Sequence, residues 1–266
     1  MNVISRHKFA ASGFRMVRFA AVGLSLLVAR SANAGLIQTV EGPGAQTSSA
    51  KDTSVIDFNN LPTGDQSSLA LDVSSSLTAK IEGKFSINPA DQYGGAIDPS
   101  NKDQSSNYFA VKEGDVTLKL SNAQAYFGLW ISAADKFNQI AFFNGDKQVG
   151  SLTGTGEFLS ALPKEYLGNP TPDFQGKNTE ENYAFVNFYA QTKEDEFDTI
   201  VLTNLPGWTV FESDNFTFST ELQAPPSGTE LPAPAAVPEP SSLALLGLGG
   251  LGLAINVLRR RRQMLK

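Results

Sequence analysis

The stretch "AYFGLWISAADKFNQIAFFNGDKQVGSLTG", Ala125 to Gly154, decides the fold. Successive side chains of a β-strand point to opposite faces, so both faces of Tyr126–Ile131 carry apolar residues. Apolar residues on both faces predict a central strand that is covered on both sides. We therefore expect Trp130 to lie in the core.

Two apolar runs follow this strand, and a turn motif separates them. The runs are FNQIAFF, 137–143, and DKQVGSL, 146–152, with Asn144-Gly145 between them. Both central residues of a type I′ turn have positive φ, which Asn and Gly tolerate best. The pattern predicts a β-hairpin with Asn144 and Gly145 at the centre of the turn.

The rest of the middle of the chain repeats this pattern of short apolar runs between turn residues. From Val55 to Thr220, runs rich in Val, Ile, Phe, Tyr and Thr are separated by Gly, Asn, Asp and Pro. About eight to eleven short strands are expected, which predicts an all-β fold: a single β-sandwich of jelly-roll type. The polar stretches 88–107 and 162–182 are expected to be long loops at one end.

The composition of the middle segment, 35–238, excludes several kinds of site. It contains eleven lysines, 26 acidic residues and no arginine, a net charge of −15, and the whole chain has no cysteine. The one histidine, His7, lies outside this segment. Disulfides, Ser-His-Asp and Cys-His catalytic systems and zinc sites rich in His or Cys are therefore excluded. An acidic surface also repels nucleic acid, which we do not expect as a partner.

The N-terminus has the three parts of a secretory signal peptide, residues 1–34. A basic region precedes the eleven-residue apolar run 19–29, which is too short to span a bilayer that needs about 20 residues. Ala32 and Ala34 then form an A-x-A cleavage site, which predicts signal peptidase as a partner. Residues 35–54, rich in Gly, Ser and Thr, are expected to be a flexible lead-in to the β-sandwich domain at 55–220.

The C-terminus has a different composition from the domain. A proline-rich linker, 221–237, precedes the segment 238–266, in which residues 241–258 carry no charge. A helix of that length is about 27 Å long, close to the roughly 30 Å of a bilayer core. The basic residues Arg259, Arg260, Arg261 and Arg262 would remain in the cytoplasm. A transmembrane helix is therefore expected here, and a signal helix at the other end.

The order of these C-terminal features resembles the PEP-CTERM sorting signal. Pro238, Glu239 and Pro240 form the Pro-Glu-Pro box, a glycine-rich apolar segment follows at once, and the arginine cluster ends the chain. The resemblance implies a Gram-negative bacterium that makes extracellular polysaccharide. It also implies an exosortase that recognises the box and processes the tail. The protein would be anchored transiently in the inner membrane and then act at the cell surface or outside the cell.

Two binding sites are candidates within the domain. In jelly-roll carbohydrate-binding modules a structural calcium is often held where the first and last strands pair. Here Asp57 follows the first strand, and Asp214 and Asn215 lie in the last, so these three would supply its oxygen ligands. The alternative is that they occupy turns and strand edges for backbone reasons. Trp208, after Pro-Gly at a strand start, is the candidate for stacking on a glycan, or else a core residue.

No pair of carboxylates is spaced as an acid and a base, so we expect a non-catalytic exported protein without a cofactor, apart from structural calcium. Its role would be structural or adhesive, with extracellular polysaccharide as a partner. The alternatives are a carbohydrate-binding module with a defined ligand and, less favoured, a glycan-acting hydrolase, which needs only two carboxylates. Exposed aromatic side chains in a row would favour binding, and facing carboxylates in a groove would favour hydrolysis.

Overall fold

The computed structural model describes residues 35–99, 105–207 and 209–226. The expected signal peptide with Ala32 and Ala34, the residue Trp208 and the whole sorting segment 238–266 lie outside these ranges. Strands make up 52% of the structure and helices are few, which confirms an all-β fold. The strands form one curled antiparallel sheet.

The described residues form twelve strands, one more than the eight to eleven that were expected. In chain order they are β1 (Ile37–Val40), β2 (Ser54–Ile56), β3 (Gly64–Ser74), β4 (Leu77–Asn88), β5 (Tyr108–Val111), β6 (Gly114–Gln124), β7 (Tyr126–Ala134), β8 (Asn138–Asn144), β9 (Lys147–Thr153), β10 (Asn182–Tyr189), β11 (Phe197–Asn204) and β12 (Phe211–Ser219). Their order in the sheet is β1-β10-β7-β12-β5-β4-β6-β11-β8-β9, with β2 on β12 and β3 on β4.

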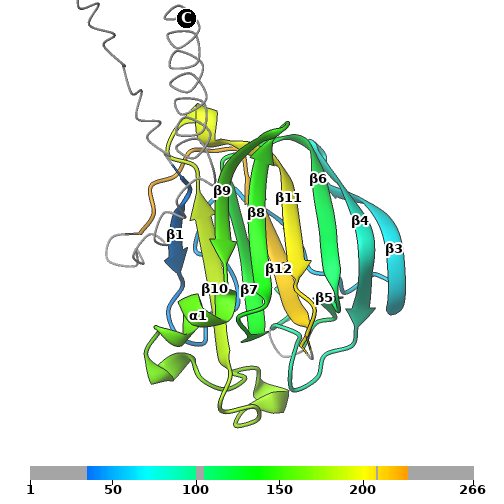
Figure 1. Ribbon diagram of the computed structural model, residues 1–266, viewed down its shortest axis with the longest axis vertical. Helices are drawn as coiled ribbons and strands as arrows, with labels where there is room; N and C mark the ends of the chain where they lie inside the picture. Colours follow the sequence, from blue (N-terminus) through cyan, green and yellow to red (C-terminus); the bar gives the residue numbers. More distant parts are fainter. Residues whose placement is uncertain (1–34, 100–104, 208, 227–266) are drawn as a thin grey trace, which may run out of the picture. The chain divides into compact units, whose positions relative to one another are not determined.

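The sheet curls so that its two halves face each other as layers (Figure 1). One layer contains β3, β4, β6, β11, β8 and β9, and the other contains β1, β10, β7, β12 and β5. Strand β4 belongs to both, because residues 79–83 pair with β6 and residues 86–88 pair with β5. Gly83 lies at this transition with φ 134°, a conformation that favours glycine, and a Cβ there would lie 2.6 Å from the carbonyl oxygen of Asp115.

The core between the layers is built largely from phenylalanine rings. Phe142 of β8 packs against Phe188 of β10 in the other layer, with ring centroids 4.7 Å apart, and against Phe197 at 5.0 Å. Phe127 of β7 lies 6.0 Å from the same ring. The three phenylalanines of β12, Phe211, Phe216 and Phe218, also lie in this core. With no cysteine, such packing holds the layers together in place of disulfides.

The predicted hairpin is confirmed as β8 and β9, but its turn is one residue further along. Asn144 pairs with Lys147, so the central residues are Gly145 and Asp146. Gly145 has φ 55°, whereas Asn144 continues the strand. A glycine at the first central position is typical of a type II′ turn rather than a type I′ turn.

The segment 35–54 was expected to be a flexible lead-in, and this is corrected by the structure. It contributes β1, which pairs with β10, and its last residue, Ser54, begins β2, which pairs with β12. Between the two strands, Gln46 is buried and hydrogen-bonded. Gly, Ser and Thr are common in ordered turns as well as in flexible segments. The composition of 35–54 therefore could not show that this segment is ordered.

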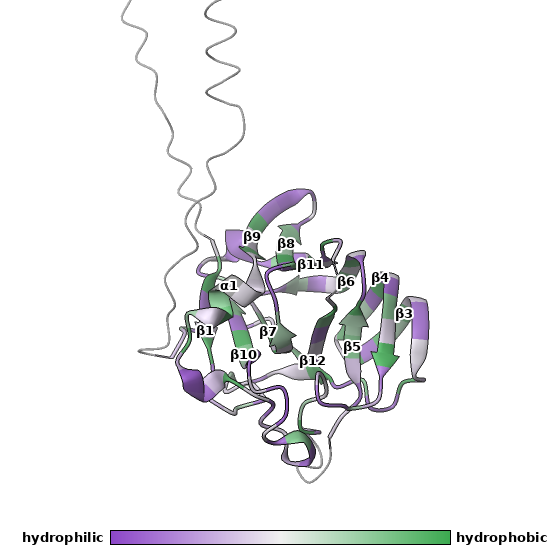
Figure 2. Ribbon diagram, turned by 60° about the horizontal axis from the view of Figure 1, so that its bottom comes forward, coloured by the Kyte–Doolittle hydropathy of each residue, from purple (hydrophilic) through white to green (hydrophobic). Residues whose placement is uncertain are grey.

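The helical elements are short and lie in the connections. Helix α1 (Thr155–Ser160) and the 3₁₀ helices η1 (Lys164–Tyr166) and η2 (Pro172–Phe174) lie between β9 and β10, and η3 (Lys193–Asp195) lies between β10 and β11. Figure 2 shows that these connections are mixed in hydropathy. Among the described residues, none of the helices has the length and apolar character needed to cross a membrane.

We predict that Phe142→Ala lowers the free energy of unfolding by about 3–5 kcal/mol, because it leaves a cavity where the two layers meet. Its neighbour Phe143 is only half-buried, since it points away from the core, and provides the matched control. Denaturant unfolding measures both. Equal losses for Phe142→Ala and Phe143→Ala would contradict this description of the core.

Candidate functional site

The face of β5, β12, β7 and β10 that points away from the core is covered by connections rather than open to solvent. Trp130 of β7 and Tyr183 and Phe185 of β10 form a second, smaller apolar cluster here, with Ala96 from the connection between β4 and β5. The Trp130 and Tyr183 ring centroids are 6.0 Å apart. Trp130 is fully buried, which confirms its expected place in a core, although this core is the outer one.

Both expected long loops take part in this cover and are tied together by hydrogen bonds to backbone oxygens. Asn169 Nδ2 and the Tyr183 hydroxyl donate to the carbonyl oxygen of Gln92, at 3.2 and 2.8 Å. The Thr171 hydroxyl donates to the carbonyl oxygen of Gly95 at 3.2 Å. Segments 89–99 and 162–181 therefore form one layer over the sheet.

Gln46 joins this cover to the closing strand. Its Nε2 donates to the Thr171 hydroxyl at 3.1 Å, and its Oε1 accepts from the backbone N–H of Ile97. Its carbonyl oxygen accepts from Asn215 Nδ2 at 3.0 Å. A single glutamine from the segment 35–54 thus satisfies groups on both loops and on β12, a role that no sequence motif indicated.

Asp214 is a fully buried carboxylate on this covered face. Its Oδ2 accepts from the Ala96 backbone N–H at 2.9 Å and from the Ser106 hydroxyl, and its Oδ1 accepts from the Asn215 N–H at 2.7 Å. Burial raises its pKa to about 8 against these hydrogen bonds, and Asp57 adds to the rise. Three hydrogen-bond donors therefore point at this carboxyl group, and no ion pair joins it to a basic side chain among the described residues.

Glu212, two residues earlier on the same face, was not identified from the sequence. It faces Ser132 of β7 and Ala110 of β5. Its pKa is raised to about 9, chiefly by desolvation and in smaller part by the carboxylates of Asp135 and Asp91. Alternation along β12 places it beside Asp214, but it remains half-buried where Asp214 is fully buried. The shielding comes from segments distant in the chain, so local sequence gave no sign of it.

Two of the three candidate calcium ligands lie on β12, and the third, Asp57, directly follows β2, which is the second strand in chain order rather than the first. Ile56 pairs with Phe216, so Asp57 comes next to Asn215 in the antiparallel register. Asn215 has φ 51° at a bulge in β12, and its Oδ1 is buried without a hydrogen-bond partner among the described residues. Asp57 Oδ1 accepts from the Asn59 N–H at 3.2 Å, so it also serves a turn.

These residues are suited to calcium only in part. A buried, unpartnered amide oxygen beside two carboxylates is the kind of oxygen set that Ca²⁺ prefers. However, three protein donors already use the Asp214 oxygens, and the described residues contain no group of three His, Cys, Asp or Glu side chains that could hold a metal.

The tyrosines of β7 and β10 are buried. Tyr126, Tyr183 and Tyr189 are each at most 2% exposed, and the Tyr126 hydroxyl is held by Asn187 Oδ1 at 2.5 Å. Tyr93 is the one aromatic residue among the exposed large hydrophobic side chains in the described ranges, at 46%. The buried Tyr126, Tyr183 and Tyr189 therefore form no open platform for a glycan.

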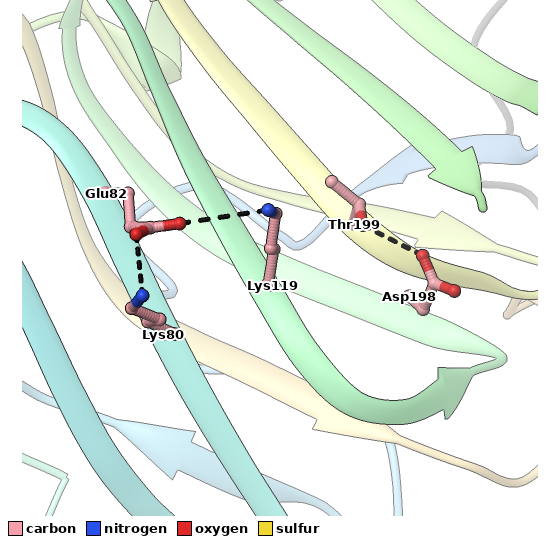
Figure 3. Close-up of polar contacts among 5 residues, drawn as sticks. All are labelled: Lys80, Glu82, Lys119, Asp198 and Thr199. Carbon is pink, nitrogen blue, oxygen red and sulfur yellow. Dashed lines mark hydrogen bonds and ion pairs between the residues drawn. The ribbon is translucent and has the colours of Figure 1, made fainter. Parts of the chain in front are cut away.

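The opposite face of the molecule, on β4, β6 and β11, is open. Lys80 Nζ lies 2.7 Å from one Glu82 oxygen, and Lys119 Nζ lies 3.8 Å from the other (Figure 3). On β11, the Thr199 hydroxyl donates to Asp198 Oδ1 at 2.8 Å. The two lysines lower the Glu82 pKa, Lys80 most strongly. Exposed pairs of this kind stabilise little and mark no site by themselves.

Comparison with known proteins identifies the C-terminal segment. The family model described as "PEP-CTERM protein-sorting motif" matches residues 236–262. The motif implies an exported protein that is processed by an exosortase, located at the cell surface or outside the cell, with transient membrane anchoring. It includes the box Pro238–Pro240 and the cluster Arg259–Arg262. No curated protein matches the chain.

We predict that the domain loses stability as the pH rises from 5 to 8. Glu212 and Asp214 have ordinary pKa values of 4.5 and 3.8, and in the folded chain these rise to about 9 and 8. Between pH 5 and 8 the folded state therefore keeps protons on these two carboxyl groups that the unfolded chain has released. The free energy of unfolding is highest below the ordinary pKa values and falls as the pH rises towards the raised ones. Each group accounts for up to about 4 kcal/mol over three pH units.

The variant Glu212→Gln has no carboxyl group to titrate at this position. Between pH 5 and 8, in buffer with chelator, its free energy of unfolding should therefore fall less steeply than that of the unmodified chain. Glu82→Gln, at an exposed carboxylate, provides the control and should keep the full slope. An unchanged slope in Glu212→Gln would show that this carboxyl is not protonated in the folded state.

Proposed function

We propose that this chain, an exported protein whose PEP-CTERM motif makes it an exosortase substrate, is a non-catalytic component of a Gram-negative cell surface or extracellular matrix. Its place there would be with extracellular polysaccharide, in a biofilm. The observation that carries the proposal is the sorting motif at 236–262. The acidic composition of the segment 35–238, without arginine, cysteine or histidine, supports a role outside the cell that needs solubility rather than His- or Cys-based chemistry.

We assign the domain to the jelly-roll type. Two strand orders support this: β5-β12-β7-β10 in one layer and β6-β11-β8-β9 in the other. Along the chain, β5 to β8 alternate between the layers, β8 and β9 form a hairpin within one, and β10 to β12 alternate again. This is the double-sheet arrangement of eight strands that defines the type, to which β1 to β4 are added.

We assign the two ends of the chain to export. Residues 1–34 would be the signal peptide, cut by signal peptidase after Ala34, and residues 241–258 would hold the chain in the inner membrane until the exosortase acts. The two prolines of the box favour an extended backbone that a protease cleft accepts. Glu239 is the one acidic residue in 238–266, so it gives the box a distinctive charge.

Binding of a defined glycan is the second candidate function. The jelly-roll strand order favours it, since such modules share the architecture. The burial of Trp130 and of the tyrosines on the same face counts against a stacking platform built from them. Trp208, outside the described residues, stays the candidate for glycan contact. A hydrolase is less favoured, since Asp214 is fully buried and Glu212, the other carboxylate on this face, is half-buried.

We also propose a structural calcium at Asp57, Asp214 and Asn215. The unpartnered Asn215 Oδ1 and the raised pKa of Asp214 support it, since a cation would satisfy the first and compensate the second. Its effect would be to fasten β2 to β12.

The exosortase assignment predicts that the mature surface protein lacks Lys266, and mass spectrometry of its C-terminus measures this. Cells without the processing enzyme should retain the intact tail in the membrane. Glu239→Gln should slow processing, because it removes the charge of the box. Glu230→Gln, in the linker, removes the same charge outside the box and should process normally. If the surface protein still carried Lys266, the tail would not be processed and would be a permanent membrane anchor.

The calcium assignment predicts a higher melting temperature in millimolar calcium than in chelator. Calorimetry should show a rise of several degrees in the unmodified chain, through preferential binding to the folded state. The rise should be absent in Asp57→Asn, whose carboxylate is half-buried and whose loss leaves the Asp214 hydrogen bonds in place. Asp65→Asn, an exposed carboxylate on β3, should keep it. The same melting temperature in both buffers would exclude the site.

A further inference from the structure

The free edges of the curled sheet differ in how they are closed. β1 ends the sheet on one side and β9 on the other, and the two meet. Gln38 Nε2 of β1 donates to the carbonyl oxygen of Ser151 on β9 at 3.1 Å. Leu36 packs on Gly150, where a Cβ would lie 2.8 Å from its Cγ. These two edges therefore cover each other.

Strand β3 has no such cover in the described part of the chain. It is eleven residues long and pairs with β4 alone, so the backbone groups of its other edge have no strand partner there (Figure 1). Native proteins blunt such an edge with proline, charged side chains or β-bulges; β3 contains no proline or lysine, and its aspartates and register shifts lie at or beyond the ends of residues 68–72. Its register shifts at 66–68 and 72–74 leave residues 68–72 as a regular edge between them.

The core-facing side of this edge is also incompletely buried. Leu69, Leu71 and Val73 point to the core but remain half-buried, whereas Leu77, Ala79 and Ile81 of the neighbouring β4 are buried. A groove of about 420 Å³ opens beside them, with Leu71, Ala79 and Leu120 in its lining together with polar side chains. The apolar core therefore continues to the edge of β3, where its side chains are only partly covered.

We propose that β3 is an assembly edge that pairs antiparallel with β3 of a second copy of this chain, about a twofold axis at Leu71. In this register Leu71 faces its own counterpart, and Leu69 faces Val73 of the other copy, twice; Val73 lies in the register shift that bounds the regular edge. All three half-buried apolar side chains of the edge then gain apolar neighbours on the core side. No other antiparallel register centred on residues 69–72 pairs all three with apolar partners.

The charges of β3 fit the same register. On the outer side, Ala70 faces Asp72 of the second copy, twice, so no carboxylate meets another. Asp65, the other acidic residue of β3, lies beyond the regular edge. The net charge of −15 on residues 35–238 opposes association at low salt, and the Debye length of about 8 Å at physiological ionic strength screens it. The layer of β9, β8, β11, β6, β4 and β3 would continue across the axis as one sheet.

Charge substitutions at Ala70 test the register, because they affect the dimer and the monomer in opposite directions. Within one chain Ala70 is exposed and faces Lys80 of β4, the lysine paired with Glu82 in Figure 3. Ala70→Asp therefore suits the monomer but meets Asp72 of the second copy. Ala70→Lys opposes Lys80 in the monomer but meets Asp72 favourably in the dimer.

Sedimentation equilibrium of the full chain in density-matched detergent, at physiological salt, measures the dissociation constant. We expect a dimer in the unmodified chain. Ala70→Asp should raise its dissociation constant roughly two- to thirtyfold, the effect of two symmetric like-charge pairs, and Ala70→Lys should lower it. A monomer at all concentrations, or a dimer that neither variant changes, would overturn the proposal.

The absence of cysteine allows a second, independent readout. A chain with Ala70→Cys mixed with a chain with Asp72→Cys should oxidise to a linked dimer, since these positions face each other at disulfide distance. Either chain alone should link less, and Thr78→Cys, exposed on β4, should give only collisional dimer. Equal yields in all cases would show that the copies do not meet through β3.

Discussion

The bulge at Asn215 allows one strand, β12, to hydrogen-bond with three others, and the rest of the domain depends on this. Before the bulge β12 lies between β5 and β7, and after it β12 lies between β2 and β7. The last strand of the domain therefore also holds β2 in the sheet. Its phenylalanines enter the core, while Glu212 and Asp214 point outward beneath the loops.

The parts of the fold that sequence predicted were those encoded by local periodicity. Alternation in Tyr126–Ile131 identified a central strand, and the break at Asn144-Gly145 identified a hairpin. The register of the turn was missed because Gly145 and Asp146 satisfy it as well as Asn144 and Gly145 would. The packing of residues 35–54 was missed because it rests on distant partners: Gln46 is fixed by Thr171, Ile97 and Asn215.

The candidate site shows the same division. Asp57 and Asn215 could be placed together from the sequence, since the strand before Asp57 was expected to pair with the last. The shielding of Glu212 and Asp214 could not, because the segments that cover this face, 89–99 and 162–181, are distant in the chain. A middle segment with 26 acidic residues gives no local sign of which of them are shielded from water. Only the tertiary arrangement of the loops distinguishes them.

The chain leaves the domain directly from β12, with Gln223 hydrogen-bonded to Lys51. A pull on residues beyond Pro226 is thus applied first to a strand that is bonded along both edges and filled with phenylalanine on one face. A pull on the other end acts on β1, four residues long and paired on one side. Tension applied at the C-terminus would therefore act first on a strand that is paired along both edges, and the ladders of β12 would have to shear before the domain opens from that end.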